Sequence, residues 1–250
     1  TSFNRENRVA GLNDADINAK AIDCLSEDLT MHLKSTINDI GHEISTDGKT
    51  AAFIEYTDKD GNEGRWQGER VLVATGRRNN IEQLGVENLG VELDDKNRPK
   101  NLDKHTGQIG DLDVYIVGDA NANIPLLHVA SDEGYSAGSI VCNQNTDAYI
   151  RPVAIPFSIV FTSPQIVNVG MTQQEIEDDP DLEYVIGKVS FDNQGRSRIM
   201  GVNCGLLHIY GCKETDKVLG ASMVGPDAEY IGHILANAIT NEICVKQLLD

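Results

Sequence analysis

Two short stretches carry residues that could contact a ligand, each directly after an apolar run. In the first, residues 71–74 predict a buried strand that runs into Gly76 and Arg77. Glycine lets the backbone approach a ligand or a neighbouring strand, and an arginine offers charge to a phosphate. An ordinary structural turn has the same pattern, so this stretch by itself leaves both interpretations open.

The second stretch is the apolar run 114–117, which is followed by Gly118 and Asp119. An aspartate at the tip of a buried strand needs hydrogen-bond partners, and the hydroxyls of a sugar or polyol are natural donors. A helix is predicted from His128 to Cys142, and its N-terminus favours negative ligand groups such as a pyrophosphate. A plain Gly-Asp turn is the alternative here too.

The elements that position these groups have the order of a Rossmann-type sheet, which presents ligand groups at the carboxyl ends of its strands. Apolar residues at helical spacing predict a helix over residues 14–29, opened by Asn13 or Asp14. Short strands are predicted at 31–37, 51–56 and 70–74, with a hairpin turn at 58–62.

After Arg151-Pro152 the pattern changes to short strands separated by turns. Strands are predicted at 159–161, 166–169, 184–189, 205–211 and 218–224, with a hairpin turn at 213–217. Residues 228–239 return to helical spacing. The C-terminal part therefore predicts an α+β domain with an antiparallel sheet.

Taken together, the two ligand-contacting stretches resemble the pyridine nucleotide-disulfide oxidoreductases of the dihydrolipoamide dehydrogenase-like type. In that family a strand ending A-T-G-R-x-x-N leads out of the nicotinamide-nucleotide domain, and a later strand ending G-D meets FAD. The stretches similar to the family are Ala74 to Asn80, Leu84 to Asp94, Gly118-Asp119, Phe161 to Ile166, Val169 to Thr172, Val218 to Gly225 and Ala228-Glu229.

The resemblance implies α/β Rossmann-like partial nucleotide-binding domains followed by an α+β interface (dimerisation) domain with an antiparallel sheet. Residues 1–79 would be a partial NAD(P)-binding domain, 80–150 the C-terminal part of an FAD-binding domain, and 151–250 a C-terminally truncated interface domain. The implied cofactors are FAD and NAD or NADP. The parent protein would be a homodimer that passes electrons from NAD(P)H through FAD to a disulfide, a lipoyl-type group or another small-molecule acceptor.

The same resemblance implies which residues bind the cofactors. Asp119, after Gly118, would bind the ribityl chain of FAD, and Gly76 and Ile37 would approach the nicotinamide nucleotide near Arg77. The backbone at the start of the predicted helix would pack against the flavin through Pro125, Leu126, Leu127 and His128. A proton-transfer role for His128 is a further alternative, although a helix-start histidine without such a role is the simpler interpretation.

Nucleotide preference is expected near the N-terminus, where Phe3 to Arg8 resembles the end of the second strand of the nicotinamide-nucleotide domain. An acidic residue there would bind the NAD ribose, whereas basic residues accommodate the NADP phosphate. The matching position is Asn4, with Arg5 and Arg8 close behind. This pattern favours NADP(H), with solvated surface arginines as the alternative.

Several of the family's chemical groups have no counterpart in the sequence. The loop pattern G-x-G-x-x-G does not occur, and no two of the five cysteines have C-x-x-x-x-C spacing. By the resemblance, the family's His-Pro pair would follow Asp250. We therefore expect a fragment truncated at both ends, with no catalytic residue of its own and no activity when isolated.

Composition narrows the classes of partner. Acidic residues number 39 against 21 basic ones, giving a net charge of −18, which argues against nucleic acid or an anionic membrane as a partner. The absence of a long apolar run and of a signal-peptide pattern predicts a cytoplasmic location.

Cysteine spacing predicts free thiols, with a Cys204–Cys212 bridge as the alternative. No metal site is predicted, since His208 and His233 lack Cys or Asp at ligand spacing.

Two other functions stay open. A soluble pyridine nucleotide transhydrogenase shares the family's fold without needing a dithiol, and Asn4 with Arg5 suits one. From another class of function, the isolated chain could serve only as a non-catalytic dimerisation module through its C-terminal domain.

Overall fold

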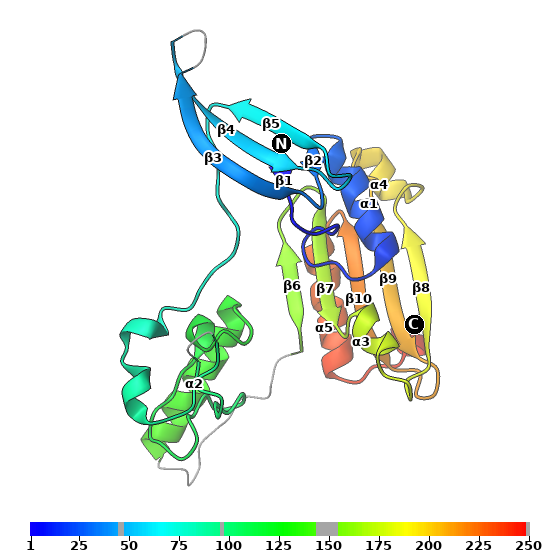
Figure 1. Ribbon diagram of the computed structural model, residues 1–250. Helices are drawn as coiled ribbons and strands as arrows, with labels where there is room; N and C mark the ends of the chain where they lie inside the picture. Colours follow the sequence, from blue (N-terminus) through cyan, green and yellow to red (C-terminus); the bar gives the residue numbers. More distant parts are fainter. Residues whose placement is uncertain (45–47, 96–97, 144–154, 249–250) are drawn as a thin grey trace. The chain divides into compact units, whose positions relative to one another are not determined.

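The chain divides into two units, one of which is assembled from its two ends. The computed structural model describes residues 1–44, 48–95, 98–143 and 155–248 (Figure 1). Unit 1 consists of Thr1–Val73 together with Ile155–Asp250, and unit 2 is Ala74–Ala154. Unit 1 therefore joins segments that are far apart in the sequence.

A five-stranded antiparallel sheet in the order β6-β7-β10-β9-β8 forms the centre of unit 1. Its strands are β6 (Phe157–Val160), β7 (Gln165–Gly170), β8 (Tyr184–Ser190), β9 (Leu206–Cys212) and β10 (Val218–Gly225). The helices are α1 (Ala15–Ser26), α3 (Gln173–Glu177), α4 (Gly195–Met200), α5 (Ala228–Thr240) and the 3-10 helix η4 (Val245–Leu248). The antiparallel sheet with its covering helices confirms the predicted α+β domain.

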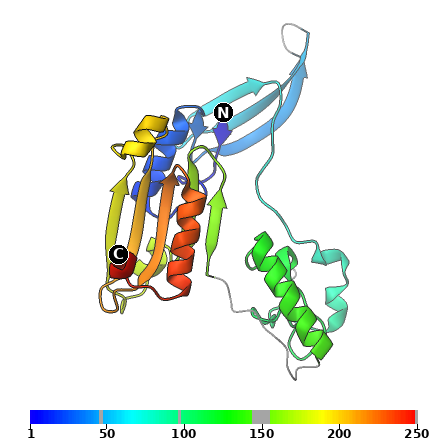
Figure 2. The same ribbon diagram turned by 180° about the vertical axis from the view of Figure 1, so that it is seen from behind.

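Alternation of side chains along the strands builds a hydrophobic core on each face of the sheet. Val167, Val169 and Met223 pack towards α5 with Leu235, while Ile166 and Val224 pack with residues of α1. Figure 1 shows α1 in front of the sheet, and Figure 2 shows α5 in front of its other face. Because neighbouring residues of a strand point to opposite faces, β7 and β10 contribute to both cores.

Helix α1 begins at a buried N-cap that also ties it to the sheet. Asp14 is 2% exposed, and its Oδ1 accepts the backbone N–H groups of Asp16 and Ile17, each at 3.0 Å. Its Oδ2 accepts the Tyr210 hydroxyl at 2.7 Å and lies 2.5 Å from Nδ1 of His208. Burial by itself would raise the pKa of Asp14, but the Ile17 amide, the Tyr210 hydroxyl and His208 together lower it.

The remaining strands of unit 1 form two small sheets. A parallel pair consists of β1 (Ser2–Phe3) and β2 (Met31–His32), and an antiparallel meander consists of β3 (Thr36–Ile44), β4 (Thr50–Thr57) and β5 (Glu63–Gly68). In the predicted turn between β4 and β5, the Asp58 carboxylate accepts the backbone N–H groups of Asp60 and Asn62. These bonds to its charged form lower the pKa of Asp58, led by the contribution of Asn62.

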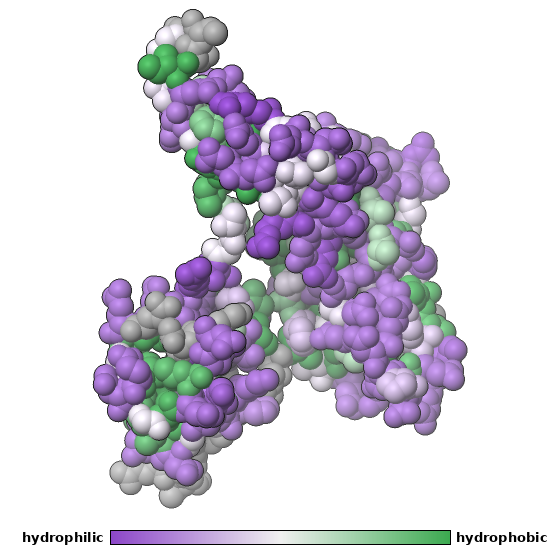
Figure 3. All heavy atoms as spheres, viewed as in Figure 1, coloured by the Kyte–Doolittle hydropathy of each residue, from purple (hydrophilic) through white to green (hydrophobic). Residues whose placement is uncertain are grey.

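Unit 2 contains the helix α2 (Leu127–Asn143) and three 3-10 helices, η1 (Ile81–Gln83), η2 (Val86–Leu89) and η3 (Gly118–Asn121). Its core is small and consists of Ile81, Val86, Ile109 and Ile116. The face of the molecule drawn in Figure 3 is mostly hydrophilic, in keeping with the net charge of −18. Among the described residues, no helix has both the length and the apolar content needed to span a bilayer.

Two predicted strands are wrong. Residues 70–74 and 114–117 have no strand in the structure, and Leu72, expected to be buried, is 90% exposed. A strand is stable only when a neighbour accepts its backbone hydrogen bonds. Among the described residues, no strand pairs with residues 70–74. Residues 114–117 form only an isolated β-bridge, between Tyr115 and Gln108.

The cysteine prediction is also wrong for two residues. Cys24 of α1 and Cys204, just before β9, form a disulfide with 5.9 Å between their Cα atoms. They are 180 residues apart in the sequence. Cys212, considered only as an alternative partner of Cys204, is free. The disulfide therefore links α1 covalently to the sheet that it covers.

Cys24→Ser is expected to lower the free energy of unfolding of unit 1 by about 2–4 kcal/mol, because the disulfide closes a long loop in the unfolded chain. Chemical unfolding with and without a reductant measures this effect, and non-reducing mass spectrometry of proteolytic peptides detects the bridge directly. Cys142→Ser, which removes an exposed free thiol, is the matched control. Equal stability of the Cys24 and Cys142 variants would contradict the assignment.

Asp14→Ala is expected to destabilise unit 1 by about 2–4 kcal/mol, because the helix loses its cap and two buried groups lose their acceptor. The exposed Asp23→Ala of the same helix is the control. Since the pKa of Asp14 is lowered in the folded state, its contribution is present above the ordinary value of 3.8 and is lost as pH falls through the folded pKa. Urea titrations across pH 2–7 should show the difference between wild type and Asp14→Ala shrinking in acid.

Candidate functional site

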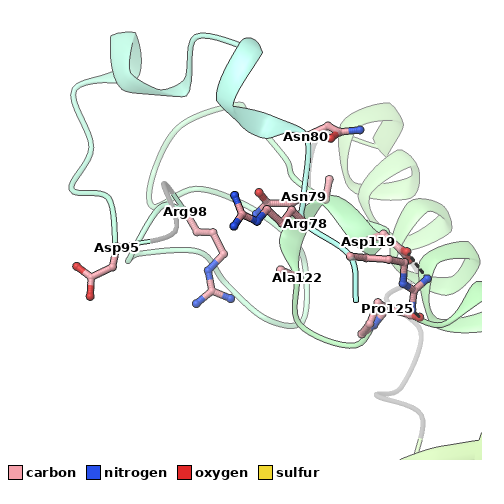
Figure 4. A pocket seen from close by; sticks show the side chains of 10 residues that line it. Arg78, Asn79, Asn80, Asp95, Arg98, Asp119, Ala122 and Pro125 are labelled. Atoms are coloured by element: carbon pink, nitrogen blue, oxygen red, sulfur yellow. Dashed lines mark hydrogen bonds and ion pairs between the residues drawn. The ribbon is translucent and has the colours of Figure 1, made fainter. Parts of the chain in front are cut away.

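A cavity of about 880 Å³ in unit 2 brings the two predicted ligand-contacting stretches together. One wall comes from the extended segment 77–80, another from η3 and the turn after it, and a third from Asp95 and Arg98. Figure 4 shows Arg78 and Arg98 near the centre of this pocket and Asp119 beside Pro125 at its edge. The pocket thus combines guanidinium groups with the carboxylates of Asp95 and Asp119.

The salt bridge between Arg77 and Asp119 joins the two stretches. Arg77 Nη1 lies 3.0 Å from Asp119 Oδ2, and Nη2 donates to the carbonyl oxygen of Pro125 at 3.1 Å. The side chain of Asp119 is still 53% exposed. A half-exposed carboxylate held in place by a cation is suited to accept hydrogen bonds from ligand hydroxyl groups.

A residue that the sequence interpretation did not assign to the site, Glu133 of α2, holds the Gly118-Asp119 turn. Its Oε2 accepts the Gly118 backbone N–H at 2.6 Å and the Asn121 side-chain amide at 2.8 Å. Gly118 has φ of +65°, a conformation that other residues rarely adopt, and an added Cβ would lie 3.0 Å from that of Ala130. One signal in the sequence could have pointed to Glu133, since it lies on the predicted helix that directly follows the turn.

The predicted flavin-contacting segment lies at the start of α2. Leu126 donates its backbone N–H to Ile124 O at 2.8 Å, and α2 begins at Leu127, whose side chain is 89% exposed. His128 is exposed in the first helical turn. Backbone N–H groups in this turn have no acceptor within the helix, which makes the end of α2 suited to a negative or carbonyl-bearing ligand.

The residues expected to contact a nicotinamide nucleotide fall in both units. Gly76, with φ of +119°, lies in unit 2 beside Arg77, whereas Ile37 lies in β3 of unit 1 and is 37% exposed.

Of the residues proposed to set the preference between NAD and NADP, Asn4 donates its backbone N–H to His32 O at 2.9 Å. Arg8 bonds to Glu6 and to Asn13, so its guanidinium is engaged within the protein. Arg5 is exposed.

The pocket of unit 2 combines cationic and carboxylate groups, and the nearby N-terminus of α2 is suited to a negatively charged ligand. Residues 2–134 match the pyridine nucleotide-disulphide oxidoreductase family, and residues 156–250 match the dimerisation domain of that family. The chain therefore belongs to the pyridine nucleotide-disulphide oxidoreductases. Proteins of this family use FAD and a nicotinamide dinucleotide.

Curated relatives include two dihydrolipoyl dehydrogenases. The mitochondrial enzyme of Dictyostelium discoideum is 28% identical over 228 residues, which cover 90% of this chain and 45% of the relative. The enzyme of Haloferax volcanii is 34% identical over 184 residues, which cover 72% of this chain and 37% of the relative. The chain thus spans less than half the length of these relatives.

Solved structures show the same fold at low sequence identity. LpdA from Mycobacterium tuberculosis matches with a TM-score of 0.76 and 20% identity, over 99% of this chain and 51% of that one. The HOCl-induced flavoprotein disulfide reductase RclA from Escherichia coli, as a mutant, matches with a TM-score of 0.79 and 18% identity, over 100% and 54%. These similarities confirm the predicted fold class.

Glu133→Ala is expected to loosen the Gly118-Asp119 turn, because Gly118 N–H and the buried Asn121 amide both lose their acceptor. Each unpaired buried group costs about 1–3 kcal/mol. Hydrogen exchange of the Gly118 amide should become faster by roughly tenfold or more, since 1.4 kcal/mol corresponds to a factor of ten. Glu133→Gln, which keeps one acceptor oxygen, should show a smaller change, and the exposed Glu87→Ala of η2 should show none.

Proposed function

We propose that this chain forms part of an FAD-dependent NAD(P)H oxidoreductase that resembles dihydrolipoyl dehydrogenase. In the parent protein, electrons would pass from NAD(P)H through FAD to a disulfide, a lipoyl-type group or another small-molecule acceptor. The observation that carries the proposal is the Arg77–Asp119 salt bridge, which joins the two family motifs at the edge of one pocket. Family membership of both parts of the chain supports it.

The residues of the pocket fit a flavin nucleotide. Asp119 offers a half-exposed acceptor to the hydroxyls of a ribityl chain, and Gly118 allows the tight turn that presents it. Bound FAD would supply the hydride and electron chemistry that no side chain provides. The protein's own part is to hold and orient it, through the carboxylate of Asp119 and the backbone from Pro125 to His128. No residue of the described chain is assigned a catalytic proton transfer.

Gly76 and Arg77 of unit 2 would contact the nicotinamide nucleotide, with NAD or NADP as the alternatives. The same role for Ile37 of unit 1 stays a separate prediction from the family resemblance. The preference for NADP(H) rests on Asn4, Arg5 and Arg8. The engagement of Arg8 with Glu6 and Asn13 weakens that preference, because a phosphate would have to compete with these partners. A transhydrogenase that needs no dithiol remains the alternative activity within the family.

The domain organisation is part of the proposal. Residues 1–79 would belong to the NAD(P)-binding domain, 80–150 to the FAD-binding domain and 151–250 to the interface domain of a homodimer. The match of residues 156–250 to a dimerisation domain supports the homodimer. The cytoplasmic location expected from the sequence stays a prediction, since the relatives include mitochondrial enzymes.

The visible absorption spectrum after incubation with FAD and desalting tests the proposal. We expect oxidised flavin bands in the wild type and at least a tenfold loss of affinity in Asp119→Ala, because the ribityl hydroxyls would lose a charged acceptor worth about 1.5–3 kcal/mol. The exposed Asp111→Ala of the same unit is the control. A wild-type chain that retains no flavin would refute the flavin site and leave the dimerisation module as its function.

A further inference from the structure

A second cluster of polar groups, in unit 1, has no part in the dinucleotide site. Asp14, Asp16 and His208 place ligand atoms within 4.8 Å of one another. Asp14 and Asp16 come from the start of α1, while His208 lies in β9, 194 residues after Asp14. This separation is why spacing along the chain offered His208 no partner.

The proton of His208 is located by its hydrogen bond. Nδ1 lies 2.5 Å from Oδ2 of Asp14, within hydrogen-bond distance of a carboxylate oxygen. This contact directs the Nδ1–H towards Asp14, so Nε2 is the ring nitrogen left to coordinate a ligand. His208 is 1% exposed, and Nε2 has no hydrogen-bond partner among the described residues.

Nε2 faces a second electron-pair donor. Oδ2 of Asp16 lies 3.9 Å away, and this carboxylate is 60% exposed. Two donors that face each other at this distance are stabilised by a cation between them. Zinc binds imidazole nitrogen at about 2.0–2.1 Å and carboxylate oxygen at about 2.0–2.2 Å, so an ion between the two atoms needs only a small shift of the exposed Asp16.

The geometry points to a binding site for a late first-row divalent metal ion, of which Zn²⁺ is the probe, between His208 Nε2 and Asp16. Asp14 acts from behind the imidazole: it fixes the ring and its tautomer, as carboxylates do for metal-bound histidines. Solvent molecules would complete the coordination on the exposed side. An imidazole ligand favours zinc-like ions over Mg²⁺ or Ca²⁺, which prefer oxygen. The site is independent of the proposed redox function.

Lys188 competes with the metal and makes the proposal testable. It stands opposite His208 in the β8–β9 pair, and its ammonium lies 2.6 Å from Asp16 Oδ2. A bound divalent ion would have to displace or repel this cation. Lys188→Met should therefore raise the affinity for Zn²⁺ by about three- to tenfold, a change that a purely structural cluster would not produce.

The experiment is calorimetric titration of the full chain with ZnCl2 alone, with thermal unfolding and reversal by EDTA as a second readout. It is done in a Cys142→Ser background to remove the exposed thiol. One ion per chain is expected to bind, and at ten times the dissociation constant the melting temperature should rise by a few degrees. Asp16→Asn should weaken binding at least tenfold, and the exposed His105→Gln should leave it unchanged.

His208→Gln should also abolish binding, but His208 is buried and this variant can fail to fold. In that case Asp16→Asn and Lys188→Met decide, since both positions are half-exposed or more. Zinc binding of equal affinity to the wild type and Asp16→Asn, or no binding to the wild type, would overturn the proposal.

Discussion

The architecture of unit 1 depends most on the hydrogen bonds of the buried Asp14 carboxylate. The carboxylate accepts a hydrogen bond from the backbone N–H of Ile17 at the start of α1. It also bonds to the side chains of His208 and Tyr210 of β9. An unpaired buried carboxylate would be costly, so the helix, His208 and Tyr210 must be in place together. The disulfide between Cys24 and Cys204 fastens the same helix near its other end.

The same requirement for paired polar groups shapes the pocket of unit 2. Arg77 and Glu133 hold the Gly118-Asp119 turn from two sides, one through the aspartate and the other through the backbone and Asn121. These hydrogen bonds fix the backbone of the turn. A site organised in this way keeps its carboxylate oriented while leaving it half-exposed to a ligand.

At three places an acidic side chain accepts backbone N–H groups at the start of a helix or in a turn, where these groups need acceptors. Asp14 does this for α1, Asp58 for the β4–β5 turn and Glu133 for η3. The acidic excess of the chain is thus partly structural, although exposed carboxylates account for much of it. A substitution of a capping aspartate therefore removes a hydrogen bond as well as a charge.

The sequence alone determined the elements whose patterns are local. Helical spacing after Asp14 predicted α1, and alternation and turn residues predicted the sheet of the C-terminal part. Two motifs identified the family, and they contain Arg77 and Asp119, which line the pocket of unit 2. Local patterns suffice there because capping, turn chemistry and side-chain period act within a few residues. Tertiary structure decided what depends on distant partners. Three results depend on which segments meet in space: residues 70–74 and 114–117 form no strand, Cys24 and Cys204 form a disulfide, and Asp14 contacts His208.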